Sequence, residues 1–462
     1  MILTKTNTLL FGTPLTCIIT GVFLVASGWQ AAQAATLAIT LWCAIWWIFE
    51  PVPIPFTSLL PIALFPLLGV LDAKQVAHAY GHWLILLLMG GFMISAAMAK
   101  SGAHRRIALQ MLQLFGGTSA TRLVLGFMVA AALLSMWISN TATTLMLLPV
   151  ALAVLEKAEP KLAIPLLLGV AYGASVGGIG TPIGTPPNLI FMSVYNEQIG
   201  AEVNFLEWMS WGLPVVIIFI PIIALWLTRG IQLERDIKLP SPGKWRPEEK
   251  RVVLVFSFTA LAWITRTAPF GGWRNWLEIP AANDASVALL AVVLLAVIPN
   301  GHIIDGKKQR LLDWYTASKI PWGVLLLFSG GLTIAAAFVS SGLADTLAGQ
   351  LSALSTVPPY LMILGICLAV TFLTEVTSNT ATSSLLMPIL AATAIAAQLD
   401  PKLLMVPAAL SASCAFMLPV ATAPNAIIFG SGQVTVKQMA REGFVLNLIG
   451  SVVISVVSYF IL

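Results

Sequence analysis

Apolar stretches of about 20 residues recur from one end of this chain to the other. Each is long enough to cross a bilayer as a helix, and lipid permits only helices or closed barrels because backbone polar groups must be bonded within the protein. Charged residues make up 9% of the sequence, far below the roughly 25% typical of soluble domains. The sequence therefore predicts an all-α polytopic membrane protein.

Apolar windows between polar segments predict about eleven crossings. They are expected near 9–28, 34–50, 55–71, 82–100, 162–195, 208–229, 252–268, 283–299, 321–340, 402–432 and 443–462. The segments 122–155 and 355–397 are interrupted by polar residues, so each is predicted to be a re-entrant hairpin. The first stretch follows Lys5 and precedes several alanines, as a secretory signal would, but its length favours a membrane helix.

The basic residues predict which way the chain is threaded. Of the 24 Lys and Arg residues, all but four fall on one face. The exceptions are Lys74, Arg266, Arg274 and Lys402. Because basic residues gather on the cytoplasmic side, we expect a bacterial inner-membrane protein with a cytoplasmic N-terminus and a periplasmic C-terminus. The net charge of +5 is then a topology signal, and no nucleic-acid partner is expected.

The two halves of the chain repeat each other on either side of the polar segment 229–251. Three blocks recur in the same order, namely the Trp83 and Trp322 helices, Ser139-Asn140-Thr141 and Ser378-Asn379-Thr380, and the stretches 184–188 and 421–425. The first Trp-led helix runs toward basic residues and the second runs away from them, so the repeats are predicted to be inverted. Inverted repeats are typical of secondary carriers that alternate access around a midplane site.

Each Ser-Asn-Thr motif lies where an apolar segment is interrupted. Its two hydroxyls and its amide can orient carboxylate oxygens and can coordinate a hard cation. A hairpin tip also presents the N-terminus of the returning helix, which attracts an anion without Lys or Arg. Such residues can instead join helices, but their duplication at symmetric positions favours ligand binding.

The blocks at 184–188 and 421–425 contain prolines that break helices and free carbonyl groups. Freed carbonyls beside Ser, Thr and Asn oxygens predict one sodium site in each half, although simple proline kinks are an alternative. In the Ser-Asn-Thr motifs, a hydroxyl precedes each Asn by five residues: Ser135 precedes Asn140, and Thr374 precedes Asn379. Glu375 is the one acidic residue predicted inside the membrane, and its counterpart is Met136, so we expect a structural or accessory role.

At these paired motifs the chain resembles the divalent anion/sodium symporter family, the sodium-coupled di- and tricarboxylate transporters, over nearly its whole length. The resemblance implies substrate contacts from Ser139, Asn140, Thr141, Thr185, Ser378, Asn379, Thr380, Thr422 and Ala423. It implies a first sodium site at Ser135, Ser139, Asn140 and Gly184 and a second at Thr374, Thr377, Asn379 and Ala421. Ala423 stands where the family commonly has a proline, which bears on substrate preference.

The resemblance also implies a homodimer in which a transport domain slides against a scaffold like an elevator. The expected scaffold parts are 1–121 and 233–354, the latter including the linker. The expected transport parts are 122–232 and 355–462, each with a hairpin and a broken helix.

The expected function is sodium-coupled symport of C4-dicarboxylates such as succinate, malate and fumarate, with sodium as the coupling ion and no cofactor. The alternative functions are a dicarboxylate exchanger, or a sulfate or citrate carrier, on the same fold. The sequence does not exclude them, because carbonyl and hydroxyl ligands look alike whether or not sodium binds to them. A membrane enzyme is disfavoured, since the sequence has no clustered His, Cys or carboxylates at membrane depth.

Overall fold

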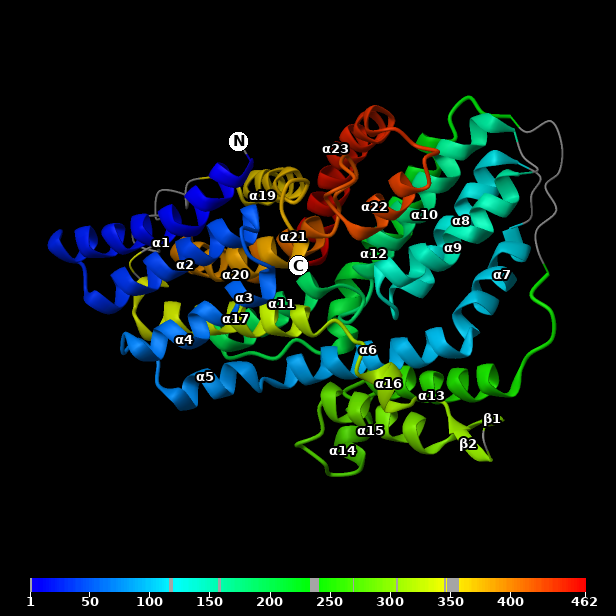
Figure 1. The fold of residues 1–462 in the computed structure, drawn as a ribbon, viewed down its shortest axis with the longest axis horizontal. Coiled ribbons are helices and arrows are strands. Elements are labelled where there is room, and N and C mark those ends of the chain that lie inside the picture. The colour runs from blue at the N-terminus through cyan, green and yellow to red at the C-terminus, as the bar shows by residue number, and fades with distance from the viewer. Residues whose placement is uncertain are drawn as a thin grey trace.

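The computed structural model describes residues 2–115, 119–156, 159–232, 241–268, 270–304, 306–344, 346 and 357–462. The described chain is mostly helical (Figure 1). The first half contains α1 (Ile2–Ala26), α2 (Ala31–Phe49), α3 (Ile54–Thr57), α4 (Leu59–Leu67), α5 (Ala73–Tyr80), α6 (Trp83–Ser101), α7 (Ala103–Phe115), α8 (Ala120–Ser135), α9 (Asn140–Leu155), the 3-10 turn η1 (Pro160–Leu162), α10 (Ala163–Gly178), α11 (Pro186–Ile199) and α12 (Phe205–Leu227). The second half contains α13 (Pro247–Ile264), α14 (Gly272–Trp276), α15 (Asp284–Val297), β1 (Pro299–Ile304), β2 (Lys307–Arg310), α16 (Trp314–Ala317), α17 (Trp322–Ser340), α19 (Pro359–Leu373), α20 (Asn379–Ala396), α21 (Lys402–Ala412), α22 (Ala423–Gly430) and α23 (Val436–Ile461).

Within these described residues, 7 helices are long and apolar enough to cross a membrane. They are α1, α2, α5 continued by α6, η1 continued by α10, α12, α17 and α23. The remaining predicted crossings correspond to helices that are shorter, interrupted or more polar, namely α3 with α4, α13, α15, and α21 with α22. The polytopic helical architecture predicted from the sequence is thus confirmed.

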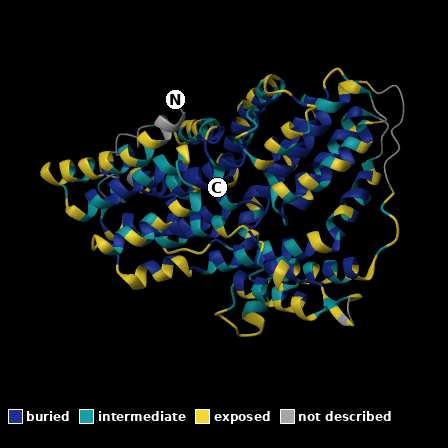
Figure 2. Cartoon of the chain, in the orientation of Figure 1, coloured by how far each residue is buried: buried dark blue, intermediate teal, exposed yellow. Residues whose placement is uncertain are grey.

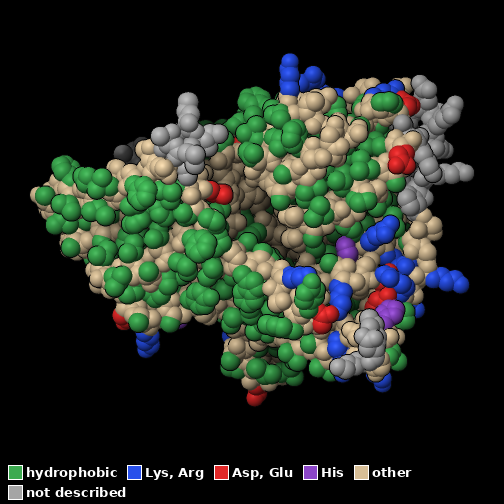
Figure 3. Space-filling model, in the orientation of Figure 1, with side chains coloured by type: hydrophobic (Ala, Val, Ile, Leu, Met, Phe, Trp, Pro, Cys, Tyr) green, Lys and Arg blue, Asp and Glu red, His purple; other side chains and the backbone are tan. Residues whose placement is uncertain are grey.

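Apolar side chains cover much of the outer surface. On α1, Phe11 is 75% and Phe23 is 67% exposed, which suits contact with lipid rather than with water. Figure 3 shows hydrophobic side chains over the part of the molecule that holds α1, α2 and α4, whereas Lys and Arg gather toward the opposite end, near α13 and the β1–β2 hairpin.

The two interrupted segments are helix pairs. In the first, α8 ends at Ser135 and α9 begins at Asn140; in the second, α19 ends at Leu373 and α20 begins at Asn379. The predicted crossings 162–195 and 402–432 are also broken, because α10 is separated from α11 and α21 from α22. Proline in the first turn of α11 and of α22 fixes where each second helix begins, since proline is favoured there.

The broken helices form the core. From Pro165 to Gly178 every residue of α10 is buried, and so is most of α11 (Figure 2). The hairpin helix α8 packs along α10, while α19 packs against α21 in the second half. Each hairpin tip is therefore held next to the break in a neighbouring helix.

One small element was not expected from the sequence. Strands β1 and β2 form an antiparallel hairpin in which Ile303 pairs with Lys308. It lies between α15 and α16 and carries basic residues, among them Lys307 and Lys308. This hairpin adds a two-stranded ribbon to an otherwise helical fold.

Candidate functional site

The tip of the first hairpin is organised by Ser139 and Asn140. Ser139 caps α9, and its hydroxyl accepts a hydrogen bond from the Ala142 N–H at 3.3 Å. Asn140 accepts a hydrogen bond through Oδ1 from the hydroxyl of Ser135 at 2.5 Å. The hydroxyl five residues before the Asn thus fixes the orientation of its side chain.

The tip of the second hairpin repeats this contact. The hydroxyl of Thr374 donates to Oδ1 of Asn379 at 2.7 Å and lies 3.0 Å from the carbonyl of Ala412. Thr374 is fully buried, at 0% exposure, as Ser135 is. The two halves therefore orient their Asn side chains by the same means.

The breaks in the two long helices are also built alike. In the first break, Nδ2 of Asn188 donates to the carbonyls of Gly178 at 3.0 Å and Thr181 at 2.7 Å. Asn425 makes the same pair of contacts in the second break. Its acceptors are the carbonyls of Ala415 at 3.1 Å and Leu418 at 3.0 Å. Each unwound segment is thus fixed by the Asn of the helix that follows it, and these two Asn residues are fully buried.

A cavity of about 720 Å³ lies where the tips and breaks meet. Most of the predicted site residues line it, namely Ser139, Asn140, Thr141, Gly184, Thr185, Thr377, Ser378, Asn379, Thr380, Ala421, Thr422 and Ala423. Ser135 and Thr374 lie behind the lining, bonded to the two Asn side chains. The volume is in the range usual for small-molecule sites.

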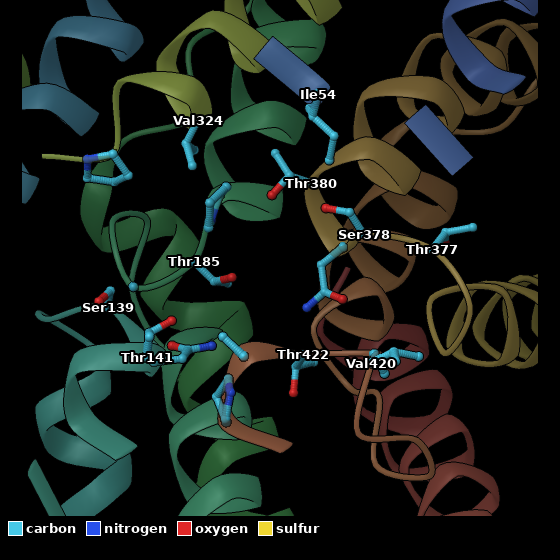
Figure 4. A pocket seen from close by; sticks show the side chains of 18 of the residues that line it. Ile54, Ser139, Thr141, Thr185, Val324, Thr377, Ser378, Thr380, Val420 and Thr422 are labelled. Atoms are coloured by element: carbon cyan, nitrogen blue, oxygen red, sulfur yellow. The ribbon is translucent and has the colours of Figure 1, made fainter. Parts of the chain in front are cut away.

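Figure 4 shows how the labelled side chains are arranged around this cavity. Ser139 and Thr141 of the first tip lie on the opposite side from Ser378 of the second tip. Thr185 and Thr422, from the two breaks, lie between them. The structure therefore brings residues from both repeats, far apart in the sequence, to one site.

The electrostatic character of the cavity comes from backbone and hydroxyl groups. Four helices begin at it, since Asn140, Pro186, Asn379 and Ala423 line the cavity and are the first residues of α9, α11, α20 and α22. A helix N-terminus carries partial positive charge and free N–H groups, which favour an anion. Among the described residues that line the cavity there is no Lys or Arg, and Glu50 is the one charged residue.

Comparisons with known proteins identify the family of the chain. A model of a protein family described as "Citrate transporter" matches residues 44–405. The sodium-dependent dicarboxylate transporter SdcS of Staphylococcus saprophyticus is 41% identical over 449 residues, which are 92% of this chain and 85% of the relative. The Staphylococcus aureus RF122 protein of the same name is 41% identical over 450 residues, with the same coverage.

The chain belongs to the family of sodium-coupled di- and tricarboxylate transporters. It is a multi-pass membrane transporter and not an enzyme. The solved structures that share its fold include the YdaH transporter of Alcanivorax borkumensis (TM-score 0.60, 14% identity, 86% of this chain and 89% of the other) and MtrF of Neisseria gonorrhoeae (TM-score 0.58, 14% identity, 86% and 83%).

Two of the oxygens predicted for the first sodium site of this transporter lie next to Gly178. A Cβ atom added to Gly178 would lie 2.7 Å from Oδ1 of Asn140 and 3.3 Å from the carbonyl oxygen of Gly184. Oδ1 of Asn140, which accepts from the Ser135 hydroxyl, and the Gly184 carbonyl oxygen therefore both lie close to Gly178 although they belong to different elements. Oxygen atoms of this kind are the ligands that hard cations prefer.

The second predicted site departs from the first in one respect. The hydroxyl of Thr377 lies 2.6 Å from the hydroxyl of Thr382 and donates to the Leu373 carbonyl at 2.9 Å, so it is engaged within its own hairpin. Asn379 and Ala421 line the cavity, and Thr374 lies directly behind Asn379.

Two features of the transporter site were not identified as site features from the sequence. The amides of Asn188 and Asn425 hold the breaks, and the recurrence of Asn at the end of each proline block was the available signal. Glu50 is the last residue of the predicted crossing 34–50, and in the structure it is the C-cap of α2 with left-handed backbone (φ 46). Its place in the cavity wall depends on tertiary packing that no local pattern records.

Proposed function

We propose that this transporter moves a C4-dicarboxylate, such as succinate, malate or fumarate, together with sodium ions. The observation that carries the proposal is the cavity itself, in which two Ser-Asn-Thr tips and four helix N-termini meet without Lys or Arg among the described lining residues. Such a site binds an anion through neutral donors and leaves oxygens for cations. The names of the 41% identical relatives support the same ligands.

In this proposal each Asn serves two ligands. Oδ1 of Asn140 or Asn379 faces a sodium ion, and the amide nitrogen faces a substrate carboxylate. The sodium ion offsets the repulsion between the tip oxygens and the incoming anion, which is strong at the low effective dielectric of a membrane interior. Sodium binding therefore prepares the site for the dicarboxylate.

We also propose that 122–232 and 355–462 form a transport domain that slides against a scaffold of 1–121 and 233–354, in a homodimer. The two walls of the cavity support this division. One wall consists of the tips and breaks, and the other includes Glu50, Ile54, Phe92 and Pro321. With the N-terminus inside, Glu50 and Pro321 lie at the inner ends of their helices, so the proposed topology places this part of the cavity wall toward the cytoplasm.

Sodium should be required for uptake. In proteoliposomes of the purified protein, we expect an inward sodium gradient to drive accumulation of labelled succinate, and replacement of sodium by choline to abolish it. If more than two sodium ions accompany each dianion, a potential of 100 mV, negative inside, adds roughly 2.3 kcal/mol per net charge that crosses the full field.

Counterflow separates symport from exchange. Vesicles loaded with succinate should take up labelled succinate only when sodium is present. Equal counterflow without sodium would instead indicate an exchanger, and uptake driven as well by a pH gradient alone would contradict sodium coupling. Malate, fumarate, citrate and sulfate as competitors define the substrate class.

The C-terminus should lie in the periplasm. An alkaline phosphatase fused after Leu462 should be active in intact cells, because about eleven crossings from a cytoplasmic start end outside. A fusion in the polar segment after Gly243 should be inactive and serves as the control. Phosphatase activity at Gly243 with none at Leu462 would mean that the proposed orientation is reversed.

A further inference from the structure

Glu375 lies inside the protein and binds the break between α21 and α22. Its side chain is 3% exposed in a segment expected to lie within the membrane. Its Oε1 accepts hydrogen bonds from the N–H groups of Phe416 at 2.7 Å and Met417 at 2.9 Å, and Oε2 accepts one from Leu418 at 3.0 Å. Three successive backbone N–H groups that converge on one anion form a nest, which is a strong anion site.

A fourth donor comes from another helix. Nδ2 of Asn447, on α23, donates to Oε1 of Glu375 at 2.8 Å. All four contacts are N–H donors, which is the pairing that a carboxylate takes. The carboxylate thus connects the second hairpin, the second break and α23.

The position of Glu375 connects it with the proposed second sodium site. It follows Thr374, whose hydroxyl orients Asn379, and it precedes Thr377 by two residues. The segment that it binds, 416–418, leads directly to Ala421, whose carbonyl is the other predicted ligand of that site. The buried carboxylate of Glu375 therefore links the segment that carries Thr374 and Thr377 to the segment that carries Ala421.

The first repeat lacks this carboxylate. Met136 occupies the equivalent position, and a Cβ added to Gly180 in the first break would lie 2.8 Å from its Cε atom. Two N–H groups of the first break are bonded along the chain instead, from Ile179 to the carbonyl of Val176 at 3.3 Å and from Gly180 to the carbonyl of Gly177 at 3.0 Å. The contacts that α12 and α23 make with the two breaks are otherwise matched. Gly212 of α12 approaches the Ile179 carbonyl, and Gly443 of α23 approaches the Phe416 carbonyl.

We propose that Glu375 is a positioning residue for the second sodium site and gives that site a negative charge that the first site lacks. This inference rests on the proposed sodium coupling. The carboxylate holds the break so that the Ala421 carbonyl stays beside Asn379, and its charge favours a cation there. The two sodium sites are therefore unequal in charge.

Glu375→Gln tests the charge with little change of shape. The variant keeps the contacts of Oε1 and places an amide nitrogen against the N–H of Leu418. We expect the sodium concentration for half-maximal succinate uptake to rise about tenfold, the lower limit for loss of a charged hydrogen bond. Succinate affinity at saturating sodium should stay within a factor of two of the parent.

Three further variants make the test selective. Glu375→Asp keeps the charge, so its shift in the sodium requirement should be smaller than that of Glu375→Gln. Met136→Leu, at the matched position of the first repeat, should leave the requirement within twofold of the parent. Asn447→Ala loosens the carboxylate, and should raise the requirement more than twofold without changing succinate affinity at saturating sodium. If Glu375→Gln does not fold, Asn447→Ala decides the question by the same twofold criterion.

Several outcomes would overturn the proposal. Glu375→Gln could keep its sodium requirement, Met136→Leu could shift it equally, or succinate affinity at saturating sodium could fall as far as sodium affinity. A parent protein that transports without sodium would instead overturn the proposed function, and this inference with it. Sodium-dependent transport by the parent with an unchanged Glu375→Gln variant would overturn the inference alone.

Discussion

Asn140→Ala and Asn379→Ala should each lower the affinities for sodium and for the dicarboxylate together, by about ten- to a hundredfold. Each Asn lines the cavity, and its Oδ1 is fixed by a buried hydroxyl, that of Ser135 or Thr374. Truncation removes an oxygen from the cation and a donor from the carboxylate. Both affinities are to be measured on purified, folded protein, with sodium titrated at fixed succinate and succinate titrated at saturating sodium.

The matched controls lie one helical turn after each Asn. The hydroxyls of Thr144 and Ser383 donate to the carbonyls of Asn140 and Asn379, each at 2.9 Å, and neither residue lines the cavity. Thr144→Val and Ser383→Ala remove a hydroxyl from the same helices and should change either affinity by less than about fivefold, since a neutral hydrogen bond contributes about 1 kcal/mol. If Asn140→Ala or Asn379→Ala keeps both affinities within twofold of the parent, that motif only joins helices.

The helices, the breaks and most of the site could be predicted because their signals are local. A Ser-Asn-Thr motif in an apolar segment marks a helix start, and a proline block marks a break, whatever the rest of the chain does. The duplication then shows which of these local features belong together. Ser135 and Thr374 were found by this comparison of the halves, and the structure places them at equivalent hydrogen bonds.

Contacts between elements that the repeat does not duplicate could not be predicted in this way. The sequence showed that Glu375 lacks an acidic counterpart, but not that its carboxylate binds the N–H groups of residues 416–418. The cavity wall at Glu50 and the small β1–β2 hairpin depend likewise on packing between distant segments. Because these features have no counterpart in the other repeat, comparison of the two halves cannot predict them, and they are seen only in the tertiary structure.

The second large effect is expected at three glycines of α10. Gly169, Gly173 and Gly177 recur every fourth residue along α10, the spacing that lets membrane helices approach closely. A Cβ at Gly177 would lie 2.2 Å from Cα of Ala132 on α8, and one at Gly173 would lie 2.9 Å from backbone atoms of Met128. The first hairpin is therefore packed directly on the backbone of α10.

Gly177→Ala should consequently displace the first hairpin. The obstacle is backbone rather than a flexible side chain, so we expect a loss of about 1–3 kcal/mol or more of folding stability and a large loss of transport. Displacement would separate Asn140 from the Gly184 carbonyl, so sodium affinity should fall in whatever protein remains folded. Thermal unfolding of the purified protein and sodium-dependent succinate uptake measure the two effects.

Gly365→Ala is the chemically matched control, because it makes the same change in a helix of the second hairpin where no atom lies within 4 Å of the added Cβ. It should leave stability and transport unchanged or slightly improved, since alanine is favoured over glycine within helices. The second repeat carries Cys414 at the position equivalent to Gly177, so a buried side chain is accommodated there. Close packing of the hairpin on α10 at this position is then a property of the first repeat. If Gly177→Ala has the stability and uptake of the parent, α8 can move away from α10 without harm to the site.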